Sequence, residues 1–208
     1  MQFDLLDNAH NQILNQTDYA SFAKALRGSN CQRCPLGQNR NHIVIDRGNP
    51  KAKIMVISER PGENEDMTGQ AFVGRAGEML DKIMASINLN SDEDLLIINV
   101  VKCLPPTDRS PLSPEVEACR PYLDKQIALV QPKVILLLGA VAYKYVSDSP
   151  QDFSMESEAG KFFTLPEYPD IQFMVLYHPA FLLRDPTKKK EMWEHVQKLK
   201  NYLNSQHR

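Results

Sequence analysis

Four cysteines constrain this chain more than any other feature of its sequence. Cys31 and Cys34 form a C-x-x-C pair, whereas Cys103 and Cys119 lie far downstream with fifteen residues between them. A C-x-x-C turn brings two thiolates to one centre, and the fold must bring the second pair to it. Zinc and an iron–sulfur cluster both take four thiolates. The open second pair slightly favours a cluster, because structural zinc more often uses two close pairs. Four unrelated cysteines are the third alternative, since free cysteine is common in protein cores.

The composition is that of an ordinary globular protein. The chain has 208 residues, of which 42% are hydrophobic and 24% charged, so we expect about one domain with a substantial core. No apolar run approaches the roughly 20 residues that a membrane helix needs. The N-terminus lacks a basic region followed by an apolar stretch, so we expect no secretory signal. These features predict a soluble, cytoplasmic protein without membrane contact, whose thiols are reduced or bound to metal.

The charge excludes one class of nucleic-acid binder and leaves another open. A formal net charge of −2 is incompatible with a uniformly basic coat. It still permits a local basic face, although such side chains more often lie on a solvated helix. The candidates for such a face are Arg75, Lys102, Arg109, Arg120, Arg184, Lys188, Lys189 and Lys190.

Short apolar runs alternate with helical patterns along the chain. The runs predict four nearly continuous buried strands at Lys53–Ser58, Asp94–Val101, Lys133–Leu138 and Ile171–Tyr177. Helical periodicity predicts helices at Tyr19–Leu26, Arg75–Leu89, Ser113–Val130, Ala140–Val146 and Thr187–Leu203. Strands separated by helical crossovers form parallel sheets that are covered on both faces. We therefore expect an α/β fold.

Chemically informative side chains follow three of the predicted strands. Four acids (Glu59, Glu63, Glu65, Asp66) and Phe72 come after the first strand, Asn99 ends the second, and His178 follows the fourth. Ligands of open α/β sheets bind beyond the carboxyl ends of the strands. Each residue alone could be a loop charge, a core anchor, a turn former or a helix cap. Together, at one edge of one sheet, they predict a binding or catalytic site.

The ordered motifs of this chain resemble those of the family-4 uracil-DNA glycosylases, the iron–sulfur enzymes of base-excision repair. The motifs are ERPGENEDMTGQAFVGRAG at 59–77, NVVKC at 99–103, PEVEACRPYL at 114–123 and HPAFLL at 178–183. The resemblance implies a three-layer αβα sandwich with a central, mainly parallel four-stranded sheet. It implies one such domain at 31–208 behind an N-terminal helical extension at 1–30. It also implies a structural [4Fe–4S] cluster on Cys31, Cys34, Cys103 and Cys119, with zinc as the minority alternative.

The resemblance implies a role for each residue of the predicted site. A uracil flipped out of DNA would stack on Phe72 and be read by the amide of Asn99, which matches uracil and mismatches cytosine. His178 would donate to uracil O2 as the glycosidic bond breaks. Glu59 and Glu65 would position the attacking water or stabilise the sugar cation. Ser58 and Arg60 would border the base in the same motif.

Three residues depart from the family pattern. Ser58 stands where glycine is usual, Arg60 where a very small residue is usual, and Ala71 where proline is usual. Arg60 could pair with Glu65 or Asp66, bind a DNA phosphate, or fill part of the pocket. We favour phosphate or carboxylate pairing, because an unpaired buried cation beside a sugar cation would raise the barrier.

The chain is therefore predicted to be a DNA-repair hydrolase. It would release free uracil from double- or single-stranded DNA, leave an abasic site, and act as a monomer associated with the nucleoid of a prokaryote-like cell. It lacks the basic insertion of relatives that attach covalently to DNA. One alternative is a catalytically weak protein that binds uracil or single-stranded DNA. Others are a glycosylase with altered base preference and, least favoured, a redox carrier.

Overall fold

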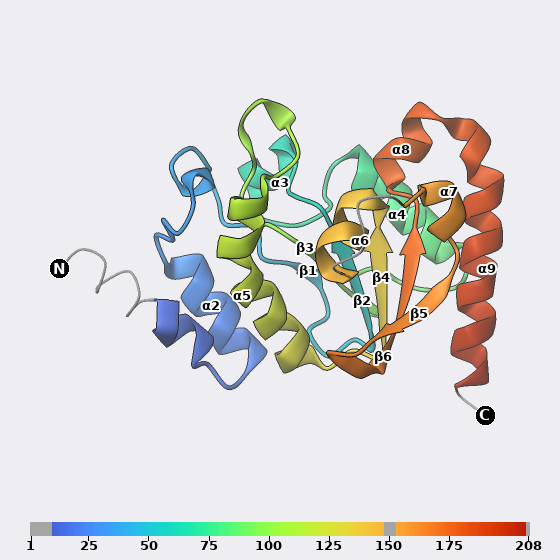
Figure 1. The fold of residues 1–208 in the computed structure, drawn as a ribbon, viewed down its shortest axis with the longest axis horizontal. Coiled ribbons are helices and arrows are strands. Elements are labelled where there is room, and N and C mark those ends of the chain that lie inside the picture. Colours follow the sequence, from blue (N-terminus) through green and yellow to red (C-terminus); the bar gives the residue numbers. More distant parts are fainter. Residues whose placement is uncertain (1–9, 148–152, 207–208) are drawn as a thin grey trace.

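Six strands form one mixed sheet in the computed structural model, which describes residues 10–147 and 153–206 (Figure 1). The strands are β1 (Arg47–Gly48), β2 (Ile54–Ser58), β3 (Leu95–Asn99), β4 (Val134–Leu138), β5 (Phe162–Leu165) and β6 (Tyr168–Leu176). Their order across the sheet is β1-β3-β2-β4-β6-β5. Strands β3, β2, β4 and β6 run parallel, and β1 and β5 pair antiparallel at the two edges. The four predicted parallel strands are confirmed, and the sheet is two strands wider than predicted.

The central strands are apolar throughout because helices cover both faces of the sheet. Every residue of β2, β3 and β4 is buried. The parallel register pairs Ser58 at the end of β2 with Asn99 at the end of β3. Two predicted site residues therefore lie side by side at the carboxyl edge of the sheet.

The helices form two outer layers. They are α2 (Tyr19–Gly28), α3 (Glu63–Thr68), α4 (Arg75–Ala85), α5 (Ser113–Val130), α6 (Gly139–Ser147), α7 (Met155–Glu158), α8 (Pro179–Arg184) and α9 (Lys189–Ser205), with short 3-10 turns η1 (Pro35–Gly37), η2 (Pro106–Asp108) and η3 (Pro186–Lys188). Helices α2, α5 and α6 share one hydrophobic core with the first face of the sheet. Helices α4, α8 and α9 share another with the opposite face. This is the predicted three-layer arrangement, visible in Figure 1.

Helix α2 belongs to the core although it lies in the predicted N-terminal extension. Its side chains Phe22 and Leu26 are 0% and 1% exposed and pack in the same cluster as α5. The hydroxyl of Tyr19 donates to Asp46 over 2.8 Å and accepts from Gln126 over 2.9 Å. The described part of the extension is thus packed against the domain.

Sequence periodicity missed the shortest elements. Strand β1 has two residues and no apolar run, and α3, α7 and α8 have only six, four and six residues. A periodic signal needs about two helical turns or an apolar run to stand out. Pairing with a neighbouring strand, rather than local sequence, defines β1.

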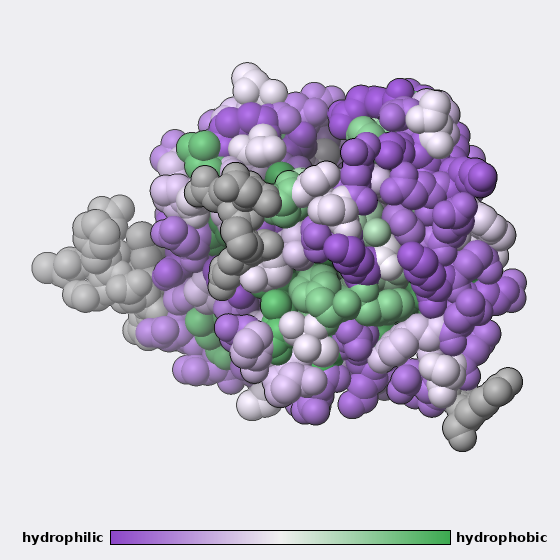
Figure 2. Space-filling model, turned by 45° about the vertical axis from the view of Figure 1, so that its right-hand side comes forward, coloured by the Kyte–Doolittle hydropathy of each residue, from purple (hydrophilic) through white to green (hydrophobic). Residues whose placement is uncertain are grey.

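The face of the domain shown in Figure 2 is mainly hydrophilic. Figure 2 shows a face that is largely purple, with a narrower hydrophobic strip across its middle. Among the described residues, no helix combines the length and the hydropathy required to cross a bilayer.

Candidate active site

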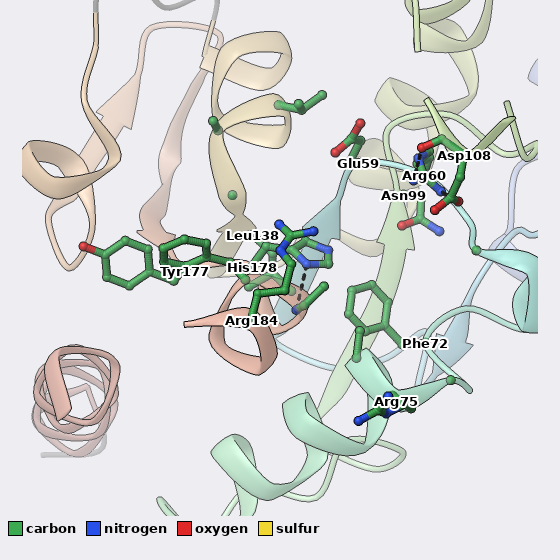
Figure 3. Close-up of a pocket in the computed structure, with 18 of the residues that line it drawn as sticks. Glu59, Arg60, Phe72, Arg75, Asn99, Asp108, Leu138, Tyr177, His178 and Arg184 are labelled. Carbon is green, nitrogen blue, oxygen red and sulfur yellow. Dashed lines mark hydrogen bonds and ion pairs between the residues drawn. The ribbon is translucent and has the colours of Figure 1, made fainter. Parts of the chain in front are cut away.

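A pocket of about 780 Å³ opens at the carboxyl edge of the sheet, where the predicted site residues meet. Six of the seven predicted catalytic and base-binding residues line it: Glu59, Arg60, Glu65, Phe72, Asn99 and His178. Figure 3 shows His178 and Arg184 on one side of this space, with Phe72 and Asn99 on the other. The seventh residue, Ser58, is 0% exposed and does not line the pocket, and its hydroxyl oxygen lies 2.9 Å from His178 Nε2.

The side-chain amide of Asn99 is buried and unpaired. Asn99 ends β3 and is 1% exposed, yet neither its Oδ1 nor its Nδ2 atom has a hydrogen-bond partner among the described residues. Its main-chain carbonyl, in contrast, accepts from the ammonium of Lys102 over 2.5 Å. Burying an amide without a partner is unfavourable unless a ligand supplies the missing bonds. The amide of Asn99 therefore offers one unpaired donor and one unpaired acceptor to a polar ligand, from a fixed position at the end of β3.

Phe72 forms the apolar wall opposite His178. The two ring centroids lie 5.9 Å apart with a tilt of 41°. Phe72 has a left-handed backbone with φ of 53°, which is rare and strained for an aromatic residue. Arg47 donates to its carbonyl over 2.8 Å, and Gly77 approaches that carbonyl so closely that a Cβ atom would lie 1.9 Å from it. These contacts hold the ring in the pocket despite the strain.

His178 is positioned as a neutral hydrogen-bond donor. Its Nδ1 atom accepts from the backbone N–H of Ala180 over 3.1 Å and caps α8. The ring proton is therefore assigned to Nε2, which lies 2.9 Å from Ser58 Oγ. Burial of the ring, with further contributions from Arg184 and Arg60, lowers the pKa of His178 to about 4. At neutral pH the imidazole is uncharged, and its single N–H, on Nε2, is donated to Ser58 Oγ in this structure.

The two predicted catalytic acids make different contacts. Glu65 accepts from three backbone N–H groups, those of Gly62 over 3.0 Å and of Val73 and Gly74 over 2.9 Å each. Its carboxylate therefore braces the loop that carries Phe72. The Oε1 atom of Glu59, in contrast, is buried without a partner in the described part of the chain. Glu59 is the acid whose carboxylate is available to a ligand or a water molecule.

Arg60 is paired with a carboxylate that the sequence did not suggest. Its Nη1 atom lies 2.7 Å from Asp108 Oδ1, and its Nη2 atom donates to the carbonyl of Asp108 over 2.6 Å. Carboxylate pairing was predicted, but with Glu65 or Asp66. Asp66 instead accepts from Asn41, with a shortest bond of 2.6 Å. Asp108 carried no sequence signal, because it lies in an irregular proline-rich loop.

Comparison with known proteins decides the family. The family model of the uracil DNA glycosylase superfamily matches residues 45–200. The chain belongs to the uracil-DNA glycosylase superfamily. Similar proteins include the Type-4 uracil-DNA glycosylases of Saccharolobus solfataricus (41% identical, covering 84% of this chain and 82% of the relative), Sulfurisphaera tokodaii (40%, 82% and 79%) and Thermotoga maritima (35%, 85% and 91%).

The four cysteines of this superfamily member gather on one side of the domain. All four are free thiols, with Cys103 and Cys119 buried and Cys31 and Cys34 partly buried against the same core. Burial raises the pKa of Cys103 to about 12, with a further contribution from Cys119, and burial raises the pKa of Cys119 to about 11 against the opposing charge of Lys102; Cys31 and Cys34 raise both pKa values further. Within the described ranges, no group of three or more His, Cys, Asp or Glu side chains is arranged to hold a metal ion. The structure thus brings the four thiols into mutual electrostatic range.

The pocket extends beyond the site that the motifs predicted. Tyr177, Phe181 and Arg184 also line it, from the end of β6 and from α8. The ring centroids of Tyr177 and Phe181 lie 5.6 Å apart. The sequence placed Phe181 in the HPAFLL motif and offered Arg184 only as part of a local basic face, and Tyr177 was marked only by its position next to His178. In this superfamily member the pocket is therefore larger than the single-base site that was predicted.

Proposed function

We propose that this protein is a uracil-DNA glycosylase that hydrolyses the bond between uracil and deoxyribose in DNA. The observation that carries the proposal is the unpaired amide of Asn99, buried in a pocket between Phe72 and the neutral donor His178. Uracil presents N3–H and O4 on one edge, which the amide oxygen and nitrogen of Asn99 can match. Cytosine presents an acceptor and a donor at those positions, so a fixed amide would disfavour it.

The bond-breaking step would depend on His178. As the bond between C1′ and N1 breaks, its electron pair moves into the uracil ring and negative charge develops on O2. On substrate binding the Nε2–H of His178 would leave its present acceptor, Ser58 Oγ, and donate to uracil O2, an effect worth about 3–4 kcal/mol for a single donor in comparable sites. Nδ1 carries no proton, because it accepts from the N–H of Ala180. The neutral ring would therefore stabilise the departing anion through the hydrogen bond from Nε2 alone.

Glu59 would complete the hydrolysis. The sugar left behind has cationic character at C1′, and water must add to it and lose a proton. Glu59 has the carboxylate oxygen that lacks a protein partner, so we assign it the water. Glu65 remains a predicted catalytic residue, and its three backbone contacts support a role in shaping the loop.

We also propose that Cys31, Cys34, Cys103 and Cys119 hold a [4Fe–4S] cluster. The chemistry of the donors fits, since four thiolates are the usual ligands of such a cluster. Burial lowers the pKa of the Lys102 ammonium to about 8, and negative charge on the nearby Cys119 and Cys103 opposes that shift, so a cluster of thiolates would favour the charged lysine. The cluster would serve as a brace between the N-terminal C-x-x-C segment and the loop beside the pocket. Zinc remains the alternative.

The proposed substrate is uracil in double- or single-stranded DNA. The Type-4 relatives are named for action on uracil in DNA, and the pocket is open enough to admit a flipped nucleotide. We propose that the protein acts as a monomer where its substrate lies, in the cytoplasm and at the nucleoid.

One assay tests the proposed activity. The purified protein is incubated with a labelled oligonucleotide that contains one uracil, and alkali then cleaves any abasic site. Strand scission at the uracil is expected, with none in a control in which thymine replaces uracil. Tight binding without scission would instead identify a uracil-binding protein and contradict the catalytic proposal.

A further inference from the structure

The structure sorts the basic residues that the sequence offered as a local basic face. Lys102 is buried and cannot meet a macromolecule. Three others are held by carboxylates: Arg109 by Glu115 over 2.7 Å, Arg120 by Asp124 over 2.7 Å, and Lys188 by Glu156 over 3.0 Å and Glu191 over 3.1 Å. Lys189 and Lys190 are exposed but do not line the pocket.

Two of the candidates remain at the pocket with their charge available. Arg75 and Arg184 are exposed and line the pocket. Neither side chain makes a hydrogen bond or an ion pair with any residue in the ranges 10–147 and 153–206. They come from different elements, α4 and α8, and Figure 3 shows them at the edge of the space that holds Phe72 and His178.

Helix stability does not account for Arg75. It is the first residue of α4, and its N-cap residue Gly74 supplies no side-chain cap. The amino end of a helix carries partial positive charge, so a cation there is unfavourable and an anion is favourable. The position of Arg75 is better explained by a ligand that the guanidinium binds.

Arg184 acts on the proposed catalytic imidazole. Its positive charge contributes to the lowered pKa of His178, which means that the two groups are electrostatic neighbours. An anion bound at Arg184 would therefore lie close to the reacting base.

Three glutamates on the pocket wall would repel DNA phosphates. Glu59, Glu63 and Glu65 line the pocket, and a nucleotide that enters must bring the phosphates on either side of its sugar to the edge. The glutamates would repel those phosphates unless cations lay between the two groups. Arg75 and Arg184 are the pocket-lining cations that no carboxylate of the described residues holds.

We propose that Arg75 and Arg184 bind the DNA phosphates that flank the flipped nucleotide. The inference rests on the proposed function, which supplies the DNA, but it concerns the phosphodiester backbone rather than the base. Because backbone contacts carry no sequence information, loss of either arginine weakens binding without changing base preference.

Salt dependence of binding provides the test. The probe is a DNA duplex with one 2′-fluoro-deoxyuridine, whose fluorine slows cleavage, and its dissociation constant is measured at several salt concentrations. Each phosphate contact that is lost should reduce the slope of log affinity against log salt by about 0.9. Arg75→Ala and Arg184→Ala should each show that reduction, and the double variant about twice as much. Arg75→Lys and Arg184→Lys should keep most of the slope.

A matched control removes a charge elsewhere. Lys133 is exposed and precedes β4, at the opposite edge of the sheet, so Lys133→Ala should leave the slope unchanged. Slopes equal to wild type in both arginine variants would overturn the proposal, and a change in only one would overturn it for the other residue. A wild-type protein that binds the duplex but leaves cleavable uracil intact would contradict the proposed function, while the slopes would still decide the phosphate contacts. Failure to bind DNA would contradict both.

Discussion

Arg60 and Asp108 are bound to each other across 48 positions of the chain, through both the carboxylate and the carbonyl of Asp108. The contact joins the loop after β2 to the loop between Cys103 and Cys119. Thr107 and Asp108 both have left-handed backbones, with φ of 55° and 61°, which residues other than glycine rarely adopt. The Arg60 contact therefore stabilises an unfavourable loop conformation at the edge of the pocket.

We expect Arg60→Ala to loosen this loop and lower the single-turnover rate a few-fold without changing the salt slope, because Asp108 already neutralises the guanidinium. Asp108→Ala should free Arg60 for phosphate, which raises DNA affinity and steepens the slope. A double-mutant cycle on unfolding should give a coupling of about 0.5–1 kcal/mol, since Asp108 is largely exposed. If Arg60→Ala cleaved uracil faster than wild type, Arg60 would be an obstruction instead.

Asn99→Asp should impair uracil cleavage and weaken discrimination against cytosine. The substitution replaces the amide donor with an acceptor at the position that faces uracil O4. A well-placed pair of base contacts discriminates by about 1–3 kcal/mol, so discrimination should fall roughly 10- to 100-fold. Cleavage rates on matched uracil and cytosine oligonucleotides measure this, and circular dichroism checks the fold. A variant with unaltered rate and selectivity would refute Asn99 as the base reader.

Substitutions of Glu59 and Glu65 should have different effects, one on the rate of catalysis and the other on the stability of the fold. Glu59→Gln should lower the single-turnover rate by about 10²–10⁴-fold with little effect on stability, because it removes a base whose Oε1 atom has no hydrogen-bond partner among the described residues. Glu65→Gln should lower the free energy of unfolding by about 1–3 kcal/mol, because its new amide group faces backbone donors. Denaturant unfolding and rate measurements on both variants give the comparison. A catalytic loss in Glu65→Gln at unchanged stability would reverse the assignment.

Sequence reasoning found what local chemistry encodes. The apolar runs of β2, β3, β4 and β6 are detectable because each strand is buried by helices on both faces. Phe72, Asn99 and His178 were predicted to converge because they follow parallel strands whose carboxyl ends share one edge. The pocket contains all three.

The remaining features depend on contacts between distant segments. Ser58 was predicted to border the base, but it is buried and does not line the pocket, and its hydroxyl lies 2.9 Å from His178 Nε2. Asp108 became significant only through Arg60. Strand β5 was missed because three of its four residues (Phe162–Leu165) are only half-buried at the sheet edge, and the exposed Thr164 interrupts the apolar signal. In each case a tertiary neighbour, rather than local pattern, determines the role.

The single-turnover rate should not fall on the acid side near pH 6.5, the ordinary pKa of a histidine. Burial, Arg184 and Arg60 lower the pKa of His178 from 6.5 to about 4, so the neutral donor persists through mildly acidic conditions. Protonation would put a second donor opposite the N–H of Ala180 and break the α8 cap. The contribution of His178 to the free energy of unfolding is complete above about pH 6.5, where the histidine of the unfolded chain is also neutral. This contribution is lost as the pH falls toward 4.

Arg184→Ala should move the acid limb of the single-turnover rate to higher pH, because a cation near the ring is removed. Arg75→Ala is the matched control, since Arg184 and Arg60, but not Arg75, are the charges that lower the pKa of His178. An acid limb at pH 6.5 in the wild type, or one that Arg184→Ala leaves in place, would contradict this account of the imidazole.

Metal analysis should find iron at about four atoms per chain in protein purified without oxygen, with the brown colour of a [4Fe–4S] cluster. Cys103→Ala should lose the iron and destabilise the domain, because the binding energy of a metal site contributes to folding. Arg40 offers a milder comparison: it donates to the carbonyl of Cys31 over 2.8 Å and lies 3.9 Å from Cys103 Sγ. Arg40→Ala should therefore retain the iron but release it faster to a chelator. Colourless, fully active protein with one zinc per chain would refute the cluster and identify zinc as the bound metal.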